Sequence, residues 1–305
     1  MNHHQFIARQ KSVMLDGVAH RPVEIAYTDI GDGPPLILLH GIPTWSYLYH
    51  AVIDRLAASH RVIAPDFIGH GSSDQRDMFD RSLVAQRAMV LGLMDHFGLA
   101  RATLIGHDTG GGVALIMGVE NQDRVDRLVL SNIVAYDSWP IDDMLQIGHP
   151  GWRAKSSEEI REFLAGGFAD GLSREDRLTD EFVDGIVAPY ITDAGKISLI
   201  RNASGLNTSH TMMVADRHHT IAAKTLLVWG VDDPWQPVGD GEKLAAEIPD
   251  ARLVRVANAS HWIQQDAPDE WLAPVLEFLA SGEENGPRPT LAPEFFLLGI
   301  IFSCQ

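Results

Sequence analysis

The feature that most restricts the fold of this sequence is a series of short, continuous apolar runs bounded by turn-forming residues. Residues 36–39 (LILL) are one example, because they follow Gly33-Pro34-Pro35 and precede Gly41. A run of this kind is typical of a strand that is buried on both faces. The pattern recurs at residues 62–64, 102–105, 128–130, 225–229 and 252–256.

Helix-like stretches separate these runs, at residues 47–56, 83–97, 111–119 and 241–248. Strands that alternate with helices predict a parallel sheet covered by helices on both sides. Two further strand candidates, 12–15 and 23–28, flank Asp16-Gly17 and indicate an N-terminal hairpin. We therefore predict an α/β protein with a mostly parallel central sheet.

The alternation breaks once, because residues 134–216 contain helical segments such as 158–168 and 193–204 but no buried strand. We interpret this stretch as an inserted helical cap on a body made of residues 1–133 and 217–280. A helix at 270–279 closes the body. Residues 281–305 are interpreted as a linker followed by an apolar tail.

Composition narrows the classes of partner. The formal net charge of -17 disfavours nucleic acid and anionic membranes, which attract clustered Lys and Arg. The single cysteine, Cys304, permits no intrachain disulfide and no cysteine metal cluster. The N-terminus lacks a signal-peptide pattern, and the apolar run 295–302 (FFLLGIIF) is too short to span a bilayer. We expect a cytoplasmic protein, whose oligomeric state the sequence leaves open.

One motif carries recognisable chemistry. Gly106-His107-Asp108-Thr109-Gly110 lies between an apolar strand and a helix, the frame of a nucleophile elbow, with Asp where Ser is usual. Small residues flank the nucleophile because the turn is too sharp for larger side chains. Asp108 is therefore a candidate nucleophile.

Two later strands end beside candidate partners of Asp108. Residues 229–234 (WGVDDP) place an acid after one strand, and 258–262 (NASHW) place His261 after the next. Active sites of α/β proteins gather at such strand ends. Alone, Asp233 could be a turn residue and His261 a satisfied polar histidine. The chain order nucleophile, acid, histidine favours the catalytic interpretation.

Together with residues 40–49 (HGIPTWSYLY) and 62–74 (VIAPDFIGHGSSD), the elbow resembles the haloalkane dehalogenase and epoxide hydrolase branch of the α/β-hydrolases. The resemblance covers roughly residues 20–280 and is weakest in the cap. It implies the α/β-hydrolase fold. It also implies that Asp108 is the nucleophile, His261 the base, and Asp233, rather than Asp232, the acid that orients the base.

The same resemblance assigns the oxyanion hole to the backbone N–H groups of Ile42 and Thr109. One branch of the dehalogenases places its acid after the strand that precedes the cap. Here that strand ends in Ser131-Asn132, without a carboxylate, so the later acid is favoured.

An aspartate nucleophile changes the expected reaction. A carboxylate, with a reference pKa of about 3.9, is already anionic at neutral pH and can attack an sp3 carbon. The product is an alkyl ester of Asp108, which water activated by His261 then hydrolyses. Attack on an ester would instead give a high-energy mixed anhydride. No step requires a cofactor or a metal.

Leaving-group donors depart from the family pattern. Thr109 stands where dehalogenases of one branch have a halide-binding Trp, and Ile42 stands where another branch has Asn. Trp139 and Trp152 in the cap are candidates to replace these donors, with apolar packing as the alternative.

Other aromatic residues are candidates for the substrate pocket. Epoxide hydrolases protonate the opening oxygen with two cap tyrosines, and Tyr136 and Tyr190 are of the right type, although both could be core edges. Trp45, after His40-Gly41, and Trp262, beside His261, are further candidates.

Three hypotheses follow. The first is a dehalogenase-like hydrolase acting on a small, largely apolar substrate and water. The second is an epoxide hydrolase, and the third is a noncatalytic ligand-binding protein on the same fold.

Overall fold

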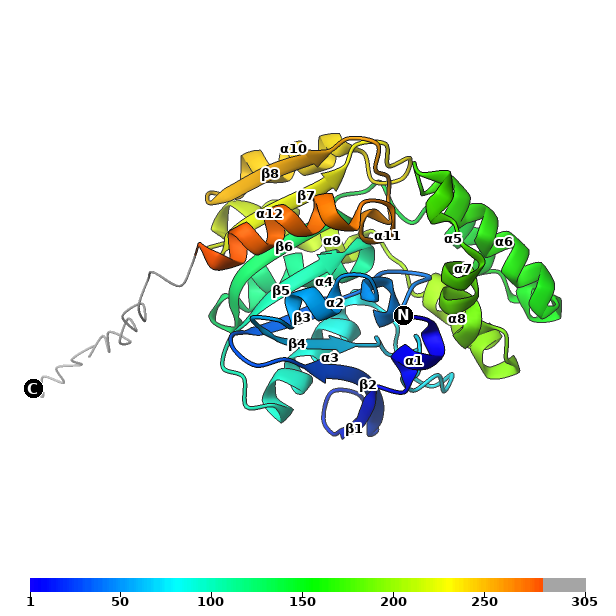
Figure 1. Ribbon diagram of the computed structural model, residues 1–305. Coiled ribbons are helices and arrows are strands. Elements are labelled where there is room, and N and C mark those ends of the chain that lie inside the picture. The colour runs from blue at the N-terminus through cyan, green and yellow to red at the C-terminus, as the bar shows by residue number, and fades with distance from the viewer. Residues whose placement is uncertain (282–305) are drawn as a thin grey trace, which may run out of the picture.

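Eight strands form one sheet in the computed structural model, which describes residues 1–281 (Figure 1). Their order across the sheet is β1-β2-β4-β3-β5-β6-β7-β8. The strands are β1 (Lys11–Leu15), β2 (Val23–Ile30), β3 (Pro35–Leu39), β4 (Arg61–Pro65), β5 (Ala102–His107), β6 (Val125–Ile133), β7 (Lys224–Gly230) and β8 (Ala251–Val256).

The predicted α/β architecture is confirmed. The N-terminal hairpin β1-β2 is antiparallel, β2 pairs antiparallel with β4, and all the remaining pairs are parallel. Along β3, Leu36 and Leu38 belong to the apolar core on one face of the sheet, whereas Ile37 and Leu39 belong to the core on the other. The continuous apolar runs follow from this burial on both faces.

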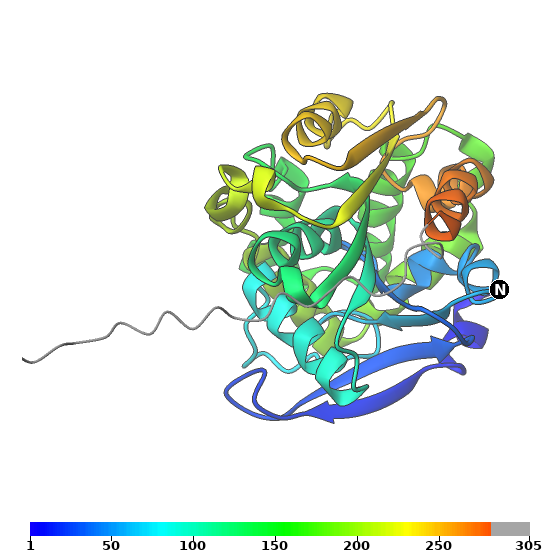
Figure 2. The ribbon, with the colours of Figure 1, turned by 90° about the vertical axis from the view of Figure 1, so that its left-hand side faces the viewer.

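Helices cover both faces of the sheet (Figure 2). Helices α3 (Leu83–His96), α4 (Asp108–Glu120) and α10 (Val238–Glu247) pack their buried side chains against one face. Helices α2 (Ile53–Leu56) and α12 (Pro268–Ala280) pack against the other. Of the helices in residues 1–281, none combines the length and the apolar character that crossing a bilayer requires.

The start of the chain differs from prediction in two places. The helix expected at 47–56 is divided into a 3-10 turn, η1 (Ser46–Tyr49), and α2, because Val52 between them leaves the helical conformation with a φ of -120°. A five-residue helix, α1 (His3–Ile7), was not predicted. Asn2 caps it, and its Phe6 is fully buried against the rings of Trp45 and Tyr47.

Helices alone connect β6 to β7, within the described residues (Figure 1). The predicted segments 158–168 and 193–204 fall in α6 and α8. The elements are α5 (Asp142–Ile147), η3 (Pro150–Ala154), α6 (Ser157–Asp170), η4 (Glu175–Arg177), α7 (Asp180–Val187), η5 (Ala188–Tyr190), α8 (Asp193–Ser204), α9 (Ser209–Ala215) and η6 (His218–Thr220). The limits 134 and 216 for the cap stay a prediction. Apart from Ser281, the predicted linker and tail lie outside the described residues.

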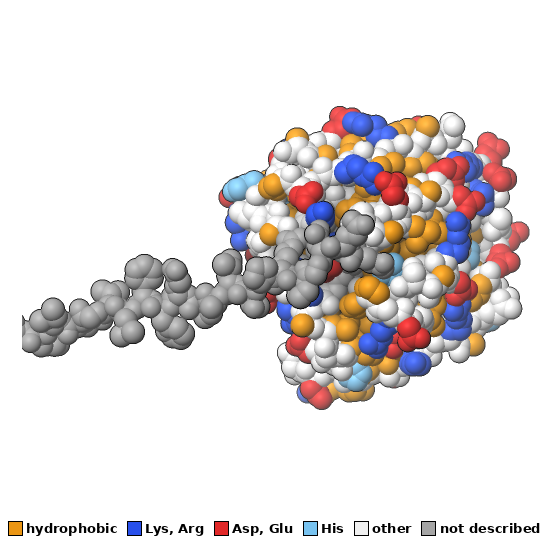
Figure 3. All heavy atoms as spheres, turned by 60° about the vertical axis from the view of Figure 1, so that its left-hand side comes forward, with side chains coloured by type: hydrophobic (Ala, Val, Ile, Leu, Met, Phe, Trp, Pro, Cys, Tyr) orange, Lys and Arg blue, Asp and Glu red, His pale blue; other side chains and the backbone are white. Residues whose placement is uncertain are grey.

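Acidic and basic side chains alternate on the face shown in Figure 3. Arg252 lies 3.2 Å from Glu277, and Arg255 lies 2.7 Å from Glu242. All four side chains are about half exposed or more, so each pair stabilises the fold by less than about 1 kcal/mol.

Candidate active site

The nucleophile elbow forms where β5 runs into α4. Asp108 takes the left-handed backbone conformation, with a φ of 48°, as it leaves the strand. A Cβ on Gly110 would lie 2.3 Å from the carbonyl oxygen of Leu39, and one on Gly106 would lie 2.6 Å from the Cα of Gly111. Both contacts are with backbone, which cannot rotate away, so the turn requires glycine at both positions.

Two backbone N–H groups converge on the Asp108 carboxylate. Ile42 N donates to Asp108 Oδ2 at 2.7 Å, and the backbone N–H of Thr109 also donates to this carboxylate. Gly41 permits the approach, because a Cβ there would lie 2.3 Å from Oδ2. These are the two donors that the resemblance assigns to the oxyanion hole.

Burial dominates the electrostatics of Asp108, which is 5% exposed. It raises the pKa of the carboxyl to about 6, although His261 and the N–H groups of Ile42 and Thr109 pull the pKa down. The carboxylate is therefore mainly ionised at neutral pH but poorly solvated, a state that favours attack on carbon.

His261 follows β8 and contacts the predicted acid. Its Nδ1 donates to Asp233 Oδ2 at 2.9 Å. Burial lowers the pKa of His261, but the charge and hydrogen bond of Asp233 and the charge of Asp108 outweigh burial, so its pKa lies above the ordinary value. With Nδ1 occupied, Nε2 is the ring nitrogen left to act as a base.

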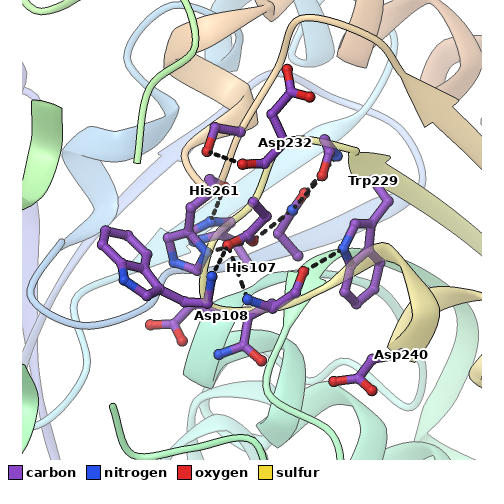
Figure 4. Close-up of polar contacts among 12 residues, drawn as sticks. His107, Asp108, Trp229, Asp232, Asp240 and His261 are labelled. Atoms are coloured by element: carbon purple, nitrogen blue, oxygen red, sulfur yellow. Dashed lines mark hydrogen bonds and ion pairs between the residues drawn. The ribbon is translucent and has the colours of Figure 1, made fainter. Parts of the chain in front are cut away.

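Asp233 is held from four directions. Its Oδ1 accepts the backbone N–H groups of Trp235 and Gln236, at 2.8 and 2.9 Å. Its Oδ2 accepts Asn132 Nδ2 at 2.7 Å as well as the His261 N–H. The neighbouring Asp232 is exposed, and its carboxylate points away from His261 (Figure 4). The structure thus places Asp233, rather than Asp232, on the imidazole.

Two residues that support this arrangement were not predicted. Asn132, with a φ of 48°, uses its amide to bond both Asp233 and the backbone of Gly230, so it joins the ends of β6 and β7. His107 Nε2 donates to the carbonyl oxygen of His261 at 2.9 Å (Figure 4). His107 lies inside the elbow motif, but the motif does not indicate which way its ring points.

Asp108 and His261 line the same cavity, whose volume is about 50 Å³. Its wall is mainly apolar. The strand-end loops and α4 contribute Ile42, Thr109, Trp235 and Trp262. The segment between β6 and β7 contributes Trp139 and Ile141 from the loop before α5, Met144 from α5, and Phe163, Leu164 and Phe168 from α6. Trp235 was missed because its sequence context is an ordinary turn.

Two predicted pocket tryptophans lie outside this cavity. Trp45 is fully buried, and its Nε1 donates to the carbonyl oxygen of Gly185 on α7, so the indole joins two parts of the fold. Trp152 packs edge-on against Phe163, which lines the cavity, but Trp152 itself does not line it. For Trp152, the alternative of apolar packing agrees with the structure.

The two predicted tyrosines also lie outside the cavity. Tyr136 donates its hydroxyl to Glu247 Oε2 at 2.7 Å, and Glu247 Oε2 also accepts His218 Nδ1 at 2.8 Å. Tyr190 is fully buried beside Asn202, and burial raises its pKa far above the ordinary value. Neither hydroxyl reaches the space above Asp108.

Trp139 and Trp262 do line the cavity, but only one indole N–H is free. Trp139 Nε1 donates to Tyr136 O and to Thr211 Oγ1. Trp262 Nε1 is buried and has no partner among the described residues. Within residues 1–281, no group of three or more His, Cys, Asp or Glu side chains is arranged to hold a metal ion.

Comparison with known proteins extends this picture. The family model described as "alpha/beta hydrolase fold" matches residues 34–268. Haloalkane dehalogenase 2 of Mycobacterium tuberculosis is 32% identical, over 83% of this chain and 90% of that protein. The 2-hydroxy-6-oxo-6-phenylhexa-2,4-dienoate hydrolase of Burkholderia cepacia is 31% identical, over 85% and 92%.

A solved structure agrees with the fold. An alpha/beta hydrolase fold protein from Burkholderia ambifaria superposes with a TM-score of 0.80 at 27% identity, over 88% of this chain and 97% of that one. Both of these relatives are hydrolases, and each matches this chain over most of its length, which disfavours the noncatalytic alternative. This chain belongs to the α/β-hydrolase fold family, in its dehalogenase-like branch, and is a hydrolase.

Proposed function

We propose that this enzyme hydrolyses a small, neutral, apolar halogenated substrate through an alkyl ester on Asp108. One observation carries the proposal: an aspartate carboxylate held by two backbone N–H groups shares a small apolar cavity with an imidazole that an acid orients. The carboxylate supplies a nucleophile suited to carbon, and the imidazole supplies the base that regenerates it.

The first step is an in-line displacement. Ile42 N–H holds Oδ2 of Asp108, so Oδ1 is the oxygen free to attack. A bond forms between Oδ1 and the substrate carbon while the carbon–halogen bond breaks, and the halide leaves with the bonding electrons. Trp262 lines the cavity, and its Nε1 has no partner within residues 1–281, so it is the candidate donor for that halide.

The second step returns the carboxylate. His261 Nε2 takes a proton from water, whose oxygen attacks Cγ of Asp108. The negative charge that develops on Oδ2 is held by the Ile42 and Thr109 N–H groups. Cγ then expels the alkoxide, which takes the proton from His261 and leaves as an alcohol. The second proton of the water, which remains on the carboxyl of Asp108, is released to solvent, and the carboxylate is restored.

The charges of the cavity favour a neutral substrate. Asp143 lies in its wall, and no Lys or Arg does among the described residues. A carboxylate substrate would meet two acidic side chains, Asp108 and Asp143, without a compensating cation. Of the two relatives, the haloalkane dehalogenase, rather than the dienoate hydrolase, is therefore the better guide to the substrate.

Epoxide hydrolysis would use the same first step, but neither Tyr136 nor Tyr190 lines the cavity, where a donor to the opening oxygen is needed. This observation ranks the epoxide alternative second. A cavity-wall donor such as Trp262 Nε1 is better suited to a halide than to an alkoxide, because an indole N–H does not give up its proton.

The test uses the variant His261→Gln, which retains the nucleophile but removes the base. The variant is incubated with short bromoalkanes and with small epoxides. Intact-mass analysis should show an added alkyl group on the protein, and a halide assay of the solution should show bromide released from the bromoalkanes. Asp108→Asn is the matched control and should show neither. Absence of any adduct, with substrates that the wild type turns over, would contradict the ester mechanism. An adduct with the epoxides alone would favour the second candidate.

A further inference from the structure

Asp266 is a buried carboxylate with an unusual set of partners. It ends the short helix α11 (Ile263–Asp266) and is fully buried. Its Oδ2 accepts the backbone N–H of Ser260 at 2.7 Å and that of Ser173 at 2.9 Å, and its Oδ1 accepts the N–H of Arg174 at 2.9 Å. Three N–H donors from two distant segments thus satisfy this charge.

These two segments are the base loop, defined as residues 258–262, and the cap connection, defined as residues 171–177 between α6 and α7. Further hydrogen bonds join them. Arg174 Nε donates to the carbonyl oxygen of Asn258 at 3.1 Å, and Trp262 N donates to that of Gly171 at 3.3 Å. Next to Asp266, Gln265 Nε2 donates to the carbonyl oxygen of Arg177 at 2.7 Å.

The contact with Ser260 matters because Ser260 directly precedes His261. The base loop starts in a left-handed turn, with a φ of 51° at Asn258, and lies outside the eight strands of the described residues. A charge-assisted bond to a buried carboxylate is stronger than a bond between neutral groups. Asp266 therefore fixes the backbone immediately before the imidazole, and it does so by bonding the cap connection with the same oxygen.

We propose that Asp266 is a positioning residue, which holds His261 in register with Asp233 and Asp108 by anchoring the base loop to the cap connection. The inference rests on the proposed function, because it concerns the step that needs the base. Asp266 touches neither substrate nor the reacting atoms. Its loss should slow hydrolysis of the ester, which needs His261, much more than formation of the ester, which needs Asp108 and the candidate halide donor Trp262 but no base.

The variant Asp266→Asn keeps the size of the side chain and replaces one acceptor oxygen with an amide nitrogen, which cannot accept an N–H. Rapid-mixing measurements with a bromoalkane should show ester formation within about threefold of the wild type. Hydrolysis of the ester should fall by roughly 10- to 100-fold, the effect of a small misplacement of a catalytic group. The ester should then accumulate in the intact mass.

Glu270→Gln is the matched control. It removes the charge that pairs with the partly exposed Arg174 guanidinium, on the same cap connection, and leaves Asp266 and its three donors intact. This control should keep both rates. A mere loss of folded protein would lower both rates together, so the ratio of the two rates separates a positioning role from a structural one.

A second readout needs no substrate. The imidazole of His261, assigned with His261→Gln, can be titrated by NMR in the wild type and in Asp266→Asn. If His261 moves away from Asp233, its pKa should fall towards that of a free imidazole. If no substrate forms an ester, the proposed function is wrong. The titration of His261 then still tests whether Asp266 positions the imidazole.

Gln265→Met serves if Asp266→Asn does not fold. It cuts the adjacent bond to Arg177 and should produce the same pattern in weaker form: slower hydrolysis with ester formation retained, and a lower pKa of His261. An unchanged ratio of the two rates together with an unchanged titration of His261, in whichever variant folds, would overturn the proposal.

Discussion

At the scale of single residues, Asp108 shows a conflict between stability and reactivity. Its carboxylate is buried, and its backbone adopts a conformation that side chains other than Asn and Asp rarely take. Burial disfavours the charged form that the proposed reaction needs. The two backbone N–H donors reduce this penalty without removing it, because the pKa still lies at about 6.

Asp108→Asn should therefore stabilise the protein at alkaline pH. The pKa of the carboxyl is about 6 in the folded protein and 3.8 ordinarily, so the buried charge destabilises the fold fully above pH 6 and not at all below about 3.8. Two pKa units correspond to about 3 kcal/mol, and weaker bonds from Asn to the two N–H donors reduce the expected gain to about 1–3 kcal/mol. Urea unfolding at pH 8 and pH 5 should show a gain that shrinks at the lower pH. An equal or larger gain at pH 5 would contradict the assignment.

The same raised pKa predicts an acid limit for ester formation. Below pH 6 the carboxyl is protonated and ceases to be a nucleophile, so the rate of the first step should fall about tenfold per pH unit there. The amplitude and rate of ester formation in the wild type, measured by rapid quench between pH 4.5 and 8, provide the test. A rate that stays constant down to pH 4.5 would show that Asp108 ionises at its ordinary pKa.

At the scale of elements, the elbow depends on how closely α4 approaches the end of β3. Gly110→Ala should cost about 1–3 kcal/mol, or more, because the new methyl group meets the carbonyl oxygens of Leu39 and His40, at 2.3 and 2.4 Å. Gly166→Ala, in the exposed part of α6 with nothing within 4 Å, should instead stabilise by about 0.4–1 kcal/mol. Thermal unfolding of both variants checks the contrast, which fails if Gly110→Ala is neutral.

The strands could be predicted from sequence because burial on both faces leaves a continuous apolar run, as in 36–39. Asp108, Asp233 and His261 could be located for a related reason: each lies in the loop or turn that follows a predicted strand, within five residues of its end. Helix α1 could not, because five residues carry too little periodicity, and the burial of Phe6 depends on a distant partner.

Other parts of the site depend on contacts that no local pattern records. Asn132 was noted only as the residue that occupies the place of an acid, yet its amide bonds Asp233 across two strands. Tyr136 is of the residue type expected of a cap proton donor, but its hydroxyl donates a hydrogen bond to Glu247, 111 residues away. Residue type was predictable in such cases, and side-chain direction was not.

At the scale of the whole molecule, helix α1 contacts both the region around Trp45 and Tyr47 and the helices that connect β6 to β7. Phe6 lies against Trp45 and Tyr47 in the core, and α1 lies beside α7 of the helices between β6 and β7 (Figure 1). The first few residues thus bring the body and these helices together on one aromatic cluster.

Phe6→Ala should consequently lower the free energy of unfolding by about 3–5 kcal/mol, the usual cost of removing a buried phenyl ring. Ile7→Ala is the matched control, because Ile7 is 39% exposed and the change should fall within about 0.5 kcal/mol. Chemical denaturation compares the two variants. Similar values for both would mean that α1 contributes little to stability.

The contacts of Asp233 and His261 have a consequence for exchanging parts between relatives. These two side chains are oriented by Asn132, His107 and the backbone of Gln236, none of which lies in the segment between β6 and β7. The facing wall comes from residues 139–168. A chimera that takes this wall from a relative should change substrate selectivity and keep the catalytic residues unchanged. The exchanged segment must end before Gly171, because Gly171 is hydrogen-bonded to the base loop.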